Sequence, residues 1–169
     1  MTPDPHHEHR LRCVADRIIN AARAAGRPPP RLLAVSKTRD AAEVAALAAL
    51  RRALGEDRPG FGENYVQEAA GKIGALGDTG IEWHLIGHLQ SNKARHAAEL
   101  FDWVQTVDRP KLVAALAQWR DPARPLDVLV QVNVDDEGSK HGCRPDDIPA
   151  LAEAIACLLY TSPSPRDRG

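Results

Sequence analysis

The fold class is predicted outward from one segment at residues 32–38, Leu32-Leu33-Ala34-Val35-Ser36-Lys37-Thr38. Its first four residues form a short apolar run, which is typical of a strand buried on both faces. Just after the stretch, Asp40 precedes Glu43 by three positions, the spacing of a capping box at the start of a helix. Apolar residues then recur at helical spacing until Gly55, where the helix is expected to end. The segment therefore predicts one strand followed by one helix.

The strand-then-helix pattern repeats along the rest of the chain. An initial helix is predicted over residues 6–25, before the first strand. Further strands are predicted around Phe61 and over 81–86, 103–107 and 126–134, and further helices over 66–76, 92–100, 110–119 and 145–156. Such alternation is typical of a parallel sheet covered by helices. It leaves two folds open: a doubly wound open sheet, or part of a (β/α)8 barrel, which needs about 250 residues when whole.

The composition of the chain argues against several classes of function. The chain has 169 residues, a formal net charge of −1 and 4% aromatic residues, which argues against a basic or base-stacking surface for nucleic acid. Its apolar runs are shorter than 18 residues, so no membrane span is expected, and its start does not have the pattern of a secretory signal. The three cysteines fit neither a disulfide framework nor a zinc motif, so a reducing cytoplasm is the simplest compartment.

Lys37 is the first candidate for chemistry. Ligands of βα proteins gather at the carboxyl ends of the strands, and Lys37 follows the first predicted strand. Because side chains alternate along a strand, Lys37 shares a face with Leu33 and Val35. If that face is buried, the cost of burying an ammonium favours the neutral amine, which attacks an aldehyde to form an imine. The alternative from pattern alone is a lysine that extends into solvent.

For the polar residues near the other predicted strand ends, a purely structural role is again the alternative to a role in ligand binding. Asn64 could cap the helix at 66–76, with Gln67 completing a capping box, and Ser91 could cap the helix at 92–100. His84, between Trp83 and Leu85, would usually be a core histidine with its hydrogen bonds satisfied. The segment 138–142, Gly-Ser-Lys-His-Gly, is either a flexible loop or a place where the backbone approaches an anion.

Four blocks of this sequence together resemble a known family. They are LLAVSKT (32–38), FGENYVQE (61–68), WHLIGHLQSNK (83–93) and VLVQVNVDDEGSKHG (128–142). In this order they are similar to the pyridoxal 5′-phosphate (PLP) homeostasis proteins, often called YggS-like, which are related to the N-terminal barrel of alanine racemase.

The resemblance implies a (β/α)8 TIM-type barrel, here incomplete, with about five βα units after an N-terminal helix. It implies PLP at the carboxyl-end mouth, held as a Schiff base by Lys37, with Asn64 near the cofactor. Lys140 of the SKHG block is a weaker candidate for PLP handling, and His84 of the third block is a further cofactor-binding candidate. Family members generally show no clear turnover, which implies a cytoplasmic PLP carrier in vitamin B6 homeostasis, with apo PLP enzymes as possible recipients.

The sequence departs from the family in its last part. The family's Ser/Gly-rich phosphate-binding segment and an arginine near the pyridine ring cannot be matched to residues 157–169. We therefore expect residues 1–156 to form a partial PLP-binding barrel and 157–169 to be an unstructured tail of foreign or artefactual sequence. Because a phosphate needs backbone N–H donors, the loss implies much weaker affinity for PLP.

Other functions stay open at this stage. A PLP-dependent racemase or decarboxylase could use the same barrel, although the chain has no room for the second domain of alanine racemase. A lysine aldolase without cofactor, an open α/β binding module and a non-functional fragment of the carrier are further alternatives.

Overall fold

The computed structural model describes residues 5–135, 137–138 and 140–159. Its helices are α1 (Pro5–Ala24), α2 (Ala41–Ala53), α3 (Val66–Leu76), α4 (Ala94–Leu100), α5 (Pro110–Trp119) and α6 (Ile148–Leu159), with short 3-10 turns η1 (Ser91–Lys93) and η2 (Pro145–Asp147). The strands are β1 (Leu33–Val35), β2 (Gly60–Glu63), β3 (Glu82–Leu85), β4 (Trp103–Val107) and β5 (Asp127–Val130). The predicted order of strands and helices is confirmed.

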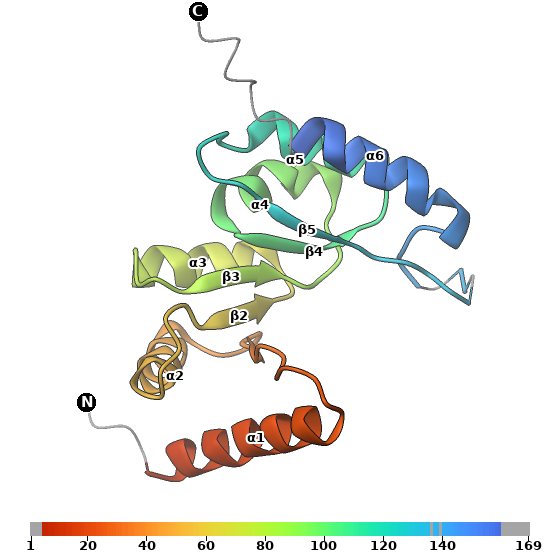
Figure 1. The fold of residues 1–169 in the computed structure, drawn as a ribbon. Coiled ribbons are helices and arrows are strands. Elements are labelled where there is room, and N and C mark those ends of the chain that lie inside the picture. Colours follow the sequence, from red (N-terminus) through yellow and green to blue (C-terminus); the bar gives the residue numbers. More distant parts are fainter. Residues whose placement is uncertain (1–4, 136, 139, 160–169) are drawn as a thin grey trace, which may run out of the picture.

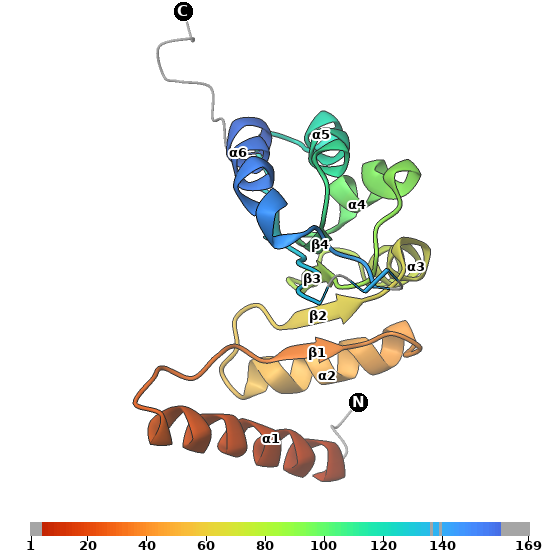
Figure 2. The same cartoon turned by 90° about the vertical axis from the view of Figure 1, so that its right-hand side faces the viewer.

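The strand order decides between the two folds that the sequence left open. All neighbouring strands are parallel, and their order in the sheet is β1-β2-β3-β4-β5, the order along the chain. Helices α2 to α6 follow one another around the outer side of this sheet (Figure 2). A doubly wound sheet reverses its order and carries helices on both faces, so the fold is an incomplete (β/α)8 barrel, as the resemblance implied.

The outer face of the sheet and the helices enclose the core. Phe61 of β2, Leu85 of β3 and Val104 of β4 are at most 1% exposed and pack with apolar side chains of the surrounding helices. The opposite face, which lines the interior of a closed barrel, stays accessible in the described part of the chain: Val35 is 52% exposed and Leu129 is 47% exposed. Helix α1 lies apart from the sheet, beyond α2 (Figures 1 and 2).

Local signals explain where elements begin and end. The predicted capping box is confirmed, because Asp40 accepts from the Glu43 N–H at 2.8 Å and Glu43 accepts from the Asp40 N–H at 3.0 Å. The strand predicted over 126–134 was too long: β5 ends at Val130, and beyond it the chain only forms an isolated bridge between Val132 and Cys143.

The last helix extends beyond the predicted boundary at residue 156. Helix α6 continues to Leu159, because Cys157, Leu158 and Leu159 contain neither proline nor glycine to stop it. The rest of the predicted tail, residues 160–169, lies outside the described residues. Within the described residues, none of the helices combines the length and apolar character needed to cross a membrane.

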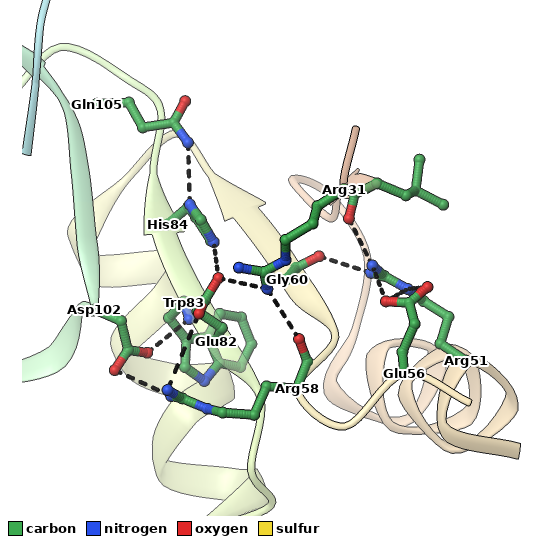
Figure 3. Close-up of polar contacts among 11 residues, drawn as sticks. Arg31, Arg51, Glu56, Arg58, Gly60, Glu82, Trp83, His84, Asp102 and Gln105 are labelled. Atoms are coloured by element: carbon green, nitrogen blue, oxygen red, sulfur yellow. Dashed lines mark hydrogen bonds and ion pairs between the residues drawn. The ribbon is translucent and has the colours of Figure 1, made fainter. Parts of the chain in front are cut away.

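A buried arginine joins α2 to the amino ends of the first two strands. Arg51 is 1% exposed, and its guanidinium donates to the Leu32 carbonyl at 2.6 Å and to the Gly60 carbonyl at 2.7 Å. Glu56 accepts from the same guanidinium at 2.7 Å, which balances its charge (Figure 3). No pattern in the sequence predicts this contact.

Gly87 provides a test of the packing at the carboxyl end of β3. A Cβ atom on Gly87 would lie 2.1 Å from the Asn64 carbonyl oxygen, which is backbone and cannot rotate away. Gly87→Ala is therefore expected to lower the free energy of unfolding by about 1–3 kcal/mol or more, measured by urea denaturation. Gly74→Ala is the control, because Gly74 lies in α3 with open space around it and alanine should stabilise the helix by about 0.5–1 kcal/mol. Equal stability of the two variants would contradict this packing.

Candidate functional site

The carboxyl end of β1 passes into a tight turn formed by residues 36–38, here called the Lys37 turn. Ser36 is 3% exposed and its N–H donates to the Gly62 carbonyl at 2.9 Å, which continues the pairing with β2. Lys37 follows with an exposed side chain, and Thr38 adopts a φ of 67°. A left-handed conformation is rare for a β-branched residue and persists only where surrounding contacts impose it.

Those contacts come from Lys72 of α3. Its ammonium donates to the Ser36 carbonyl at 2.8 Å, to Glu63 Oε1 at 2.7 Å and to Glu68 Oε1 at 2.8 Å. The Ser36 hydroxyl donates to the same Glu63 oxygen at 2.5 Å, and the Thr38 N–H donates to Glu68 Oε1 at 2.7 Å. Both ends of the Lys37 turn are therefore fixed by one network, here called the Lys72 network (Ser36, Thr38, Glu63, Glu68 and Lys72).

The centre of the Lys72 network is buried, and its one ammonium binds two carboxylates. Glu63 is fully buried and the Lys72 side chain is 7% exposed. Hydrogen bonds from Lys72 and from the Thr38 backbone lower the pKa of Glu68. Burial acts to lower the pKa of Lys72, but hydrogen bonds to Glu63 and Glu68 outweigh it and raise the pKa. The ammonium and the Glu68 carboxylate thus stay charged at neutral pH.

Lys72 is not among the residues predicted from the sequence to form the site, although its position in the sequence indicates a buried partner. Lys72 is four residues after Glu68, the spacing of an ion pair on a helix, and one residue before the apolar Ile73. A lysine on the apolar side of an amphipathic helix is unusual, because burying an ammonium is costly unless it is paired. Its position predicts a buried partner, which only the fold identifies as Glu63 of β2.

Lys37 itself differs from expectation in its burial. Leu33 and Val35 do face the barrel interior, but that face is open, and Lys37 is exposed rather than buried. The desolvation on which the argument for a neutral amine rested is therefore absent. Among the residues that the structure describes, Lys37 forms neither a hydrogen bond nor an ion pair, so its amine is accessible to a ligand at the mouth.

Asn64 follows β2 at the same edge, and its predicted capping role is wrong. The N-cap of α3 is Tyr65, so Asn64 stands one residue before the cap. The Asn64 backbone instead lies against Gly87, at the carboxyl end of β3. Asn64 is half-buried and belongs to the mouth of the barrel, one strand along from Lys37. Its predicted contact with a cofactor stays a prediction.

His84 lies deeper in the barrel interior than Lys37. The register aligns Val35 with Gly62 and Gly62 with His84. Lys37 comes two residues after Val35 and beyond the end of β1, so it lies nearer the mouth than the layer of Val35, Gly62 and His84. His84 Nε2 lies 2.9 Å from Glu82 Oε1, and Gln105 Nε2 lies 3.0 Å from His84 Nδ1 (Figure 3). This pattern fits a neutral imidazole that donates to Glu82 and accepts from Gln105.

Burial decides the charge of His84. The residue is 8% exposed and its ring stacks on Trp103 with centroids 5.5 Å apart. Burial lowers the pKa of His84 despite the nearby Glu82 carboxylate. Its two ring nitrogens are engaged within the protein, as expected of a core histidine, and its predicted part in cofactor binding stays a prediction.

Lys140 lies on the loop after β5. Its ammonium pairs with Glu137 at 2.8 Å, and both side chains are about half exposed. An exposed pair of this kind contributes little to stability, on the order of 0–1 kcal/mol, so Lys140 can exchange Glu137 for an anionic ligand at low cost. Its role in PLP handling also stays a prediction.

Comparison with known proteins adds to this geometry. The profile of the family described as "Alanine racemase, N-terminal domain" matches residues 10–160. The chain belongs to this family. Two curated relatives are both named pyridoxal phosphate homeostasis protein: one from Pseudomonas aeruginosa, 51% identical over 148 residues, and one from Escherichia coli K12, 46% identical over 157 residues. The family resemblance read from the sequence is therefore confirmed.

Solved structures agree with the fold. PipY of Synechococcus elongatus, in a structure without PLP, matches with a TM-score of 0.73 at 35% identity, covering 89% of this chain and 65% of PipY. A second PipY structure, with PLP bound, matches with a TM-score of 0.62 at 36% identity, covering 82% of this chain and 63% of PipY. The chain covers 62% of the P. aeruginosa protein and 64% of the E. coli protein, while 86% and 89% of the chain is matched.

Replacing Lys72 tests the Lys72 network. Lys72→Met leaves the buried Glu63 carboxylate without its cation, and removing one partner of a buried ion pair costs about 3–5 kcal/mol. Urea denaturation should show a loss of this size. Lys111→Met is the control, because Lys111 is exposed on α5, and its stability should change by less than about 0.5 kcal/mol. A loss under 1 kcal/mol for Lys72→Met would contradict the buried pairing.

His84 predicts a pH dependence of stability. Because its pKa is lower in the folded than in the unfolded chain, the unfolded state binds more protons below the ordinary histidine pKa of about 6.5. Stability should therefore fall as the pH drops below about 6.5. His84→Gln should show a smaller fall between pH 7 and pH 5 in urea denaturation. Identical pH profiles for both proteins would mean that His84 titrates normally in the folded state.

Proposed function

We propose that this chain is a PLP-binding protein of vitamin B6 homeostasis, in which Lys37 holds the cofactor as a Schiff base. The observation that carries the proposal is the accessible amine of Lys37 at the carboxyl end of β1, on a turn whose backbone the Lys72 network fixes. Imine formation needs an amine that an aldehyde can reach, and a fixed turn keeps that amine in one place.

The relatives support the same cofactor. PipY has been solved with PLP bound, and the two bacterial relatives are named for PLP homeostasis. The chain spans less than two thirds of these two relatives' length, so the activity of the whole protein is part of the proposal. When bound, PLP supplies an electrophilic aldehyde that captures amines.

Other residues of the mouth have supporting roles in this proposal. Asn64 contacts the cofactor from the end of β2, and Lys140 contributes positive charge from the loop after β5. His84, farther from the mouth than Lys37, supports the floor of the site through its bonds to Glu82 and Gln105. Helices α2 to α5 begin on the mouth side, where their N-termini favour an anion such as a phosphate.

The resemblance places a Ser/Gly-rich phosphate-binding segment and an arginine in a part of the family that residues 1–169 do not match. We therefore expect these residues by themselves to bind PLP more weakly than the full-length relatives do. We further propose that residues 1–156 act as the PLP-binding unit, which α6 extends to Leu159, and that the sequence after this helix is a separate tail. We place the protein in the cytoplasm, where apo PLP enzymes are its recipients and turnover is not its role.

Lys37→Ala tests the proposal. Protein incubated with PLP and freed of excess should show the visible absorbance of an imine, and borohydride should trap the adduct on the peptide that contains Lys37. Lys37→Ala should lose the band and the trapped adduct while keeping its melting temperature, because the side chain is exposed. Lys111→Ala is the matched control, because Lys111 is an exposed lysine on α5 to which the proposal assigns no role.

The results of this test distinguish a wrong assignment of Lys37 from a correct assignment in a protein that binds PLP weakly. Covalent PLP retained by Lys37→Ala at the level of the parent protein would overturn the assignment of Lys37. If the parent protein shows no band, the test is repeated with a fusion in which the C-terminal part of a full-length relative follows α6. A band that returns only in the fusion would mean that the residues are assigned correctly and that the phosphate site limits affinity.

A further inference from the structure

Three side chains with metal-binding atoms gather at the mouth, away from the Lys37 turn. His88 follows β3, Asp108 follows β4, and His141 lies on the loop after β5. One ligand atom of each lies within 4.8 Å of the others. His88 Nδ1 is 3.8 Å from Asp108 Oδ2, and the rings of His88 and His141 stack with centroids 3.6 Å apart. The proposed function uses none of these three residues.

The loop that carries His141 is held in place by its own contacts. The Gln131 side chain donates to the His141 carbonyl at 3.1 Å, and the Asn133 N–H donates to the Cys143 carbonyl at 2.8 Å. Gly142 has a φ of 133°, and a Cβ there would lie 2.6 Å from the Asn133 nitrogen. The loop therefore needs glycine at 142, next to His141, to bring the imidazole over His88.

Asp108 is also fixed, with one oxygen directed to the cluster. Its Oδ1 is bound by the Arg109 guanidinium, which donates in addition to the Leu89 carbonyl at 3.0 Å and to the Ser91 hydroxyl at 3.2 Å. The other oxygen, Oδ2, is the one that faces His88. A carboxylate held on one oxygen and presented through the other is a common arrangement around metal ligands.

The donor set selects a class of ion. Two imidazoles and one carboxylate suit Zn²⁺ and other first-row divalent ions, whereas Mg²⁺ and Ca²⁺ prefer oxygen ligands alone. Ligands about 2.1 Å from a tetrahedral ion lie roughly 3.4 Å apart, and the donor atoms here lie within 4.8 Å of one another. Binding one ion also requires the two stacked rings to tilt, so that the lone pairs of their nitrogens converge. Both imidazoles are exposed, which leaves room for this tilt.

We propose that His88, Asp108 and His141 form a three-ligand site for a divalent transition metal ion, with Zn²⁺ as its natural probe. Three protein ligands leave a coordination position for water or a small anion, as in open zinc sites.

Metal titration of the protein without PLP tests the site independently of the proposed function. His9 and Cys13 also face each other on α1, 3.6 Å apart, so every protein carries His9→Ala and Cys13→Ser. Isothermal titration with Zn²⁺ should show one site, unaffected by excess Mg²⁺. Co²⁺ should give visible ligand-field absorption typical of nitrogen and oxygen ligands.

Single substitutions identify the ligands. His88→Ala, His141→Ala and Asp108→Asn should each weaken Zn²⁺ binding at least about tenfold and reduce the Co²⁺ absorption, with thermal melts to verify folding. His96→Ala is the matched control, because His96 is exposed on α4, outside the cluster, and should bind like the parent. The proposal is overturned if the parent binds no Zn²⁺, or if His88→Ala and His141→Ala bind it as the parent does.

Discussion

The ammonium of Lys72 is the contact on which the mouth of this barrel depends. It joins α3 to the carboxyl ends of β1 and β2, because its three acceptors come from a strand end, a strand and its own helix. Lys72 and Glu63 form a buried ion pair, and replacing both partners of such a pair by apolar residues is often neutral or stabilising. The effect of the Lys72 network here is positional. Lys72 binds the Ser36 carbonyl, and Glu68, which Lys72 also binds, accepts from the Thr38 N–H. Together they fix the backbone on both sides of Lys37.

The open interior explains why Lys37 is exposed. In a closed (β/α)8 barrel the inward side chains of all strands pack in layers, whereas in this chain Val35 and Leu129 remain about half exposed on that face. Elsewhere in the interior, polar side chains contact one another. Glu82 accepts from Arg31 and His84, and His84 stacks on Trp103. The floor of the barrel is thus organised even though its interior is accessible.

The mouth has two chemically different parts. Near β1 and β2, an accessible amine and the half-buried Asn64 suit an aldehyde cofactor. Near β3, β4 and β5, two imidazoles and a carboxylate suit a metal ion. Both parts arise from one property of parallel βα units, in which every strand delivers the residues after it to the same edge of the sheet.

The order of strands and helices, the capping box at Asp40 and the position of Lys37 after β1 could all be predicted from the sequence. These are local features, fixed by hydrophobic period, turn residues and short motifs within one unit. The exposure of Lys37, the contact of Asn64 with Gly87 in place of a cap on α3, and the pairing of Lys72 with Glu63 could be found only in the folded structure. It also brought His88 and His141 together from positions 53 residues apart (141 − 88). The physical reason is that these contacts join different strand–helix units, and their distances depend on strand order and register, which a period along the chain does not contain.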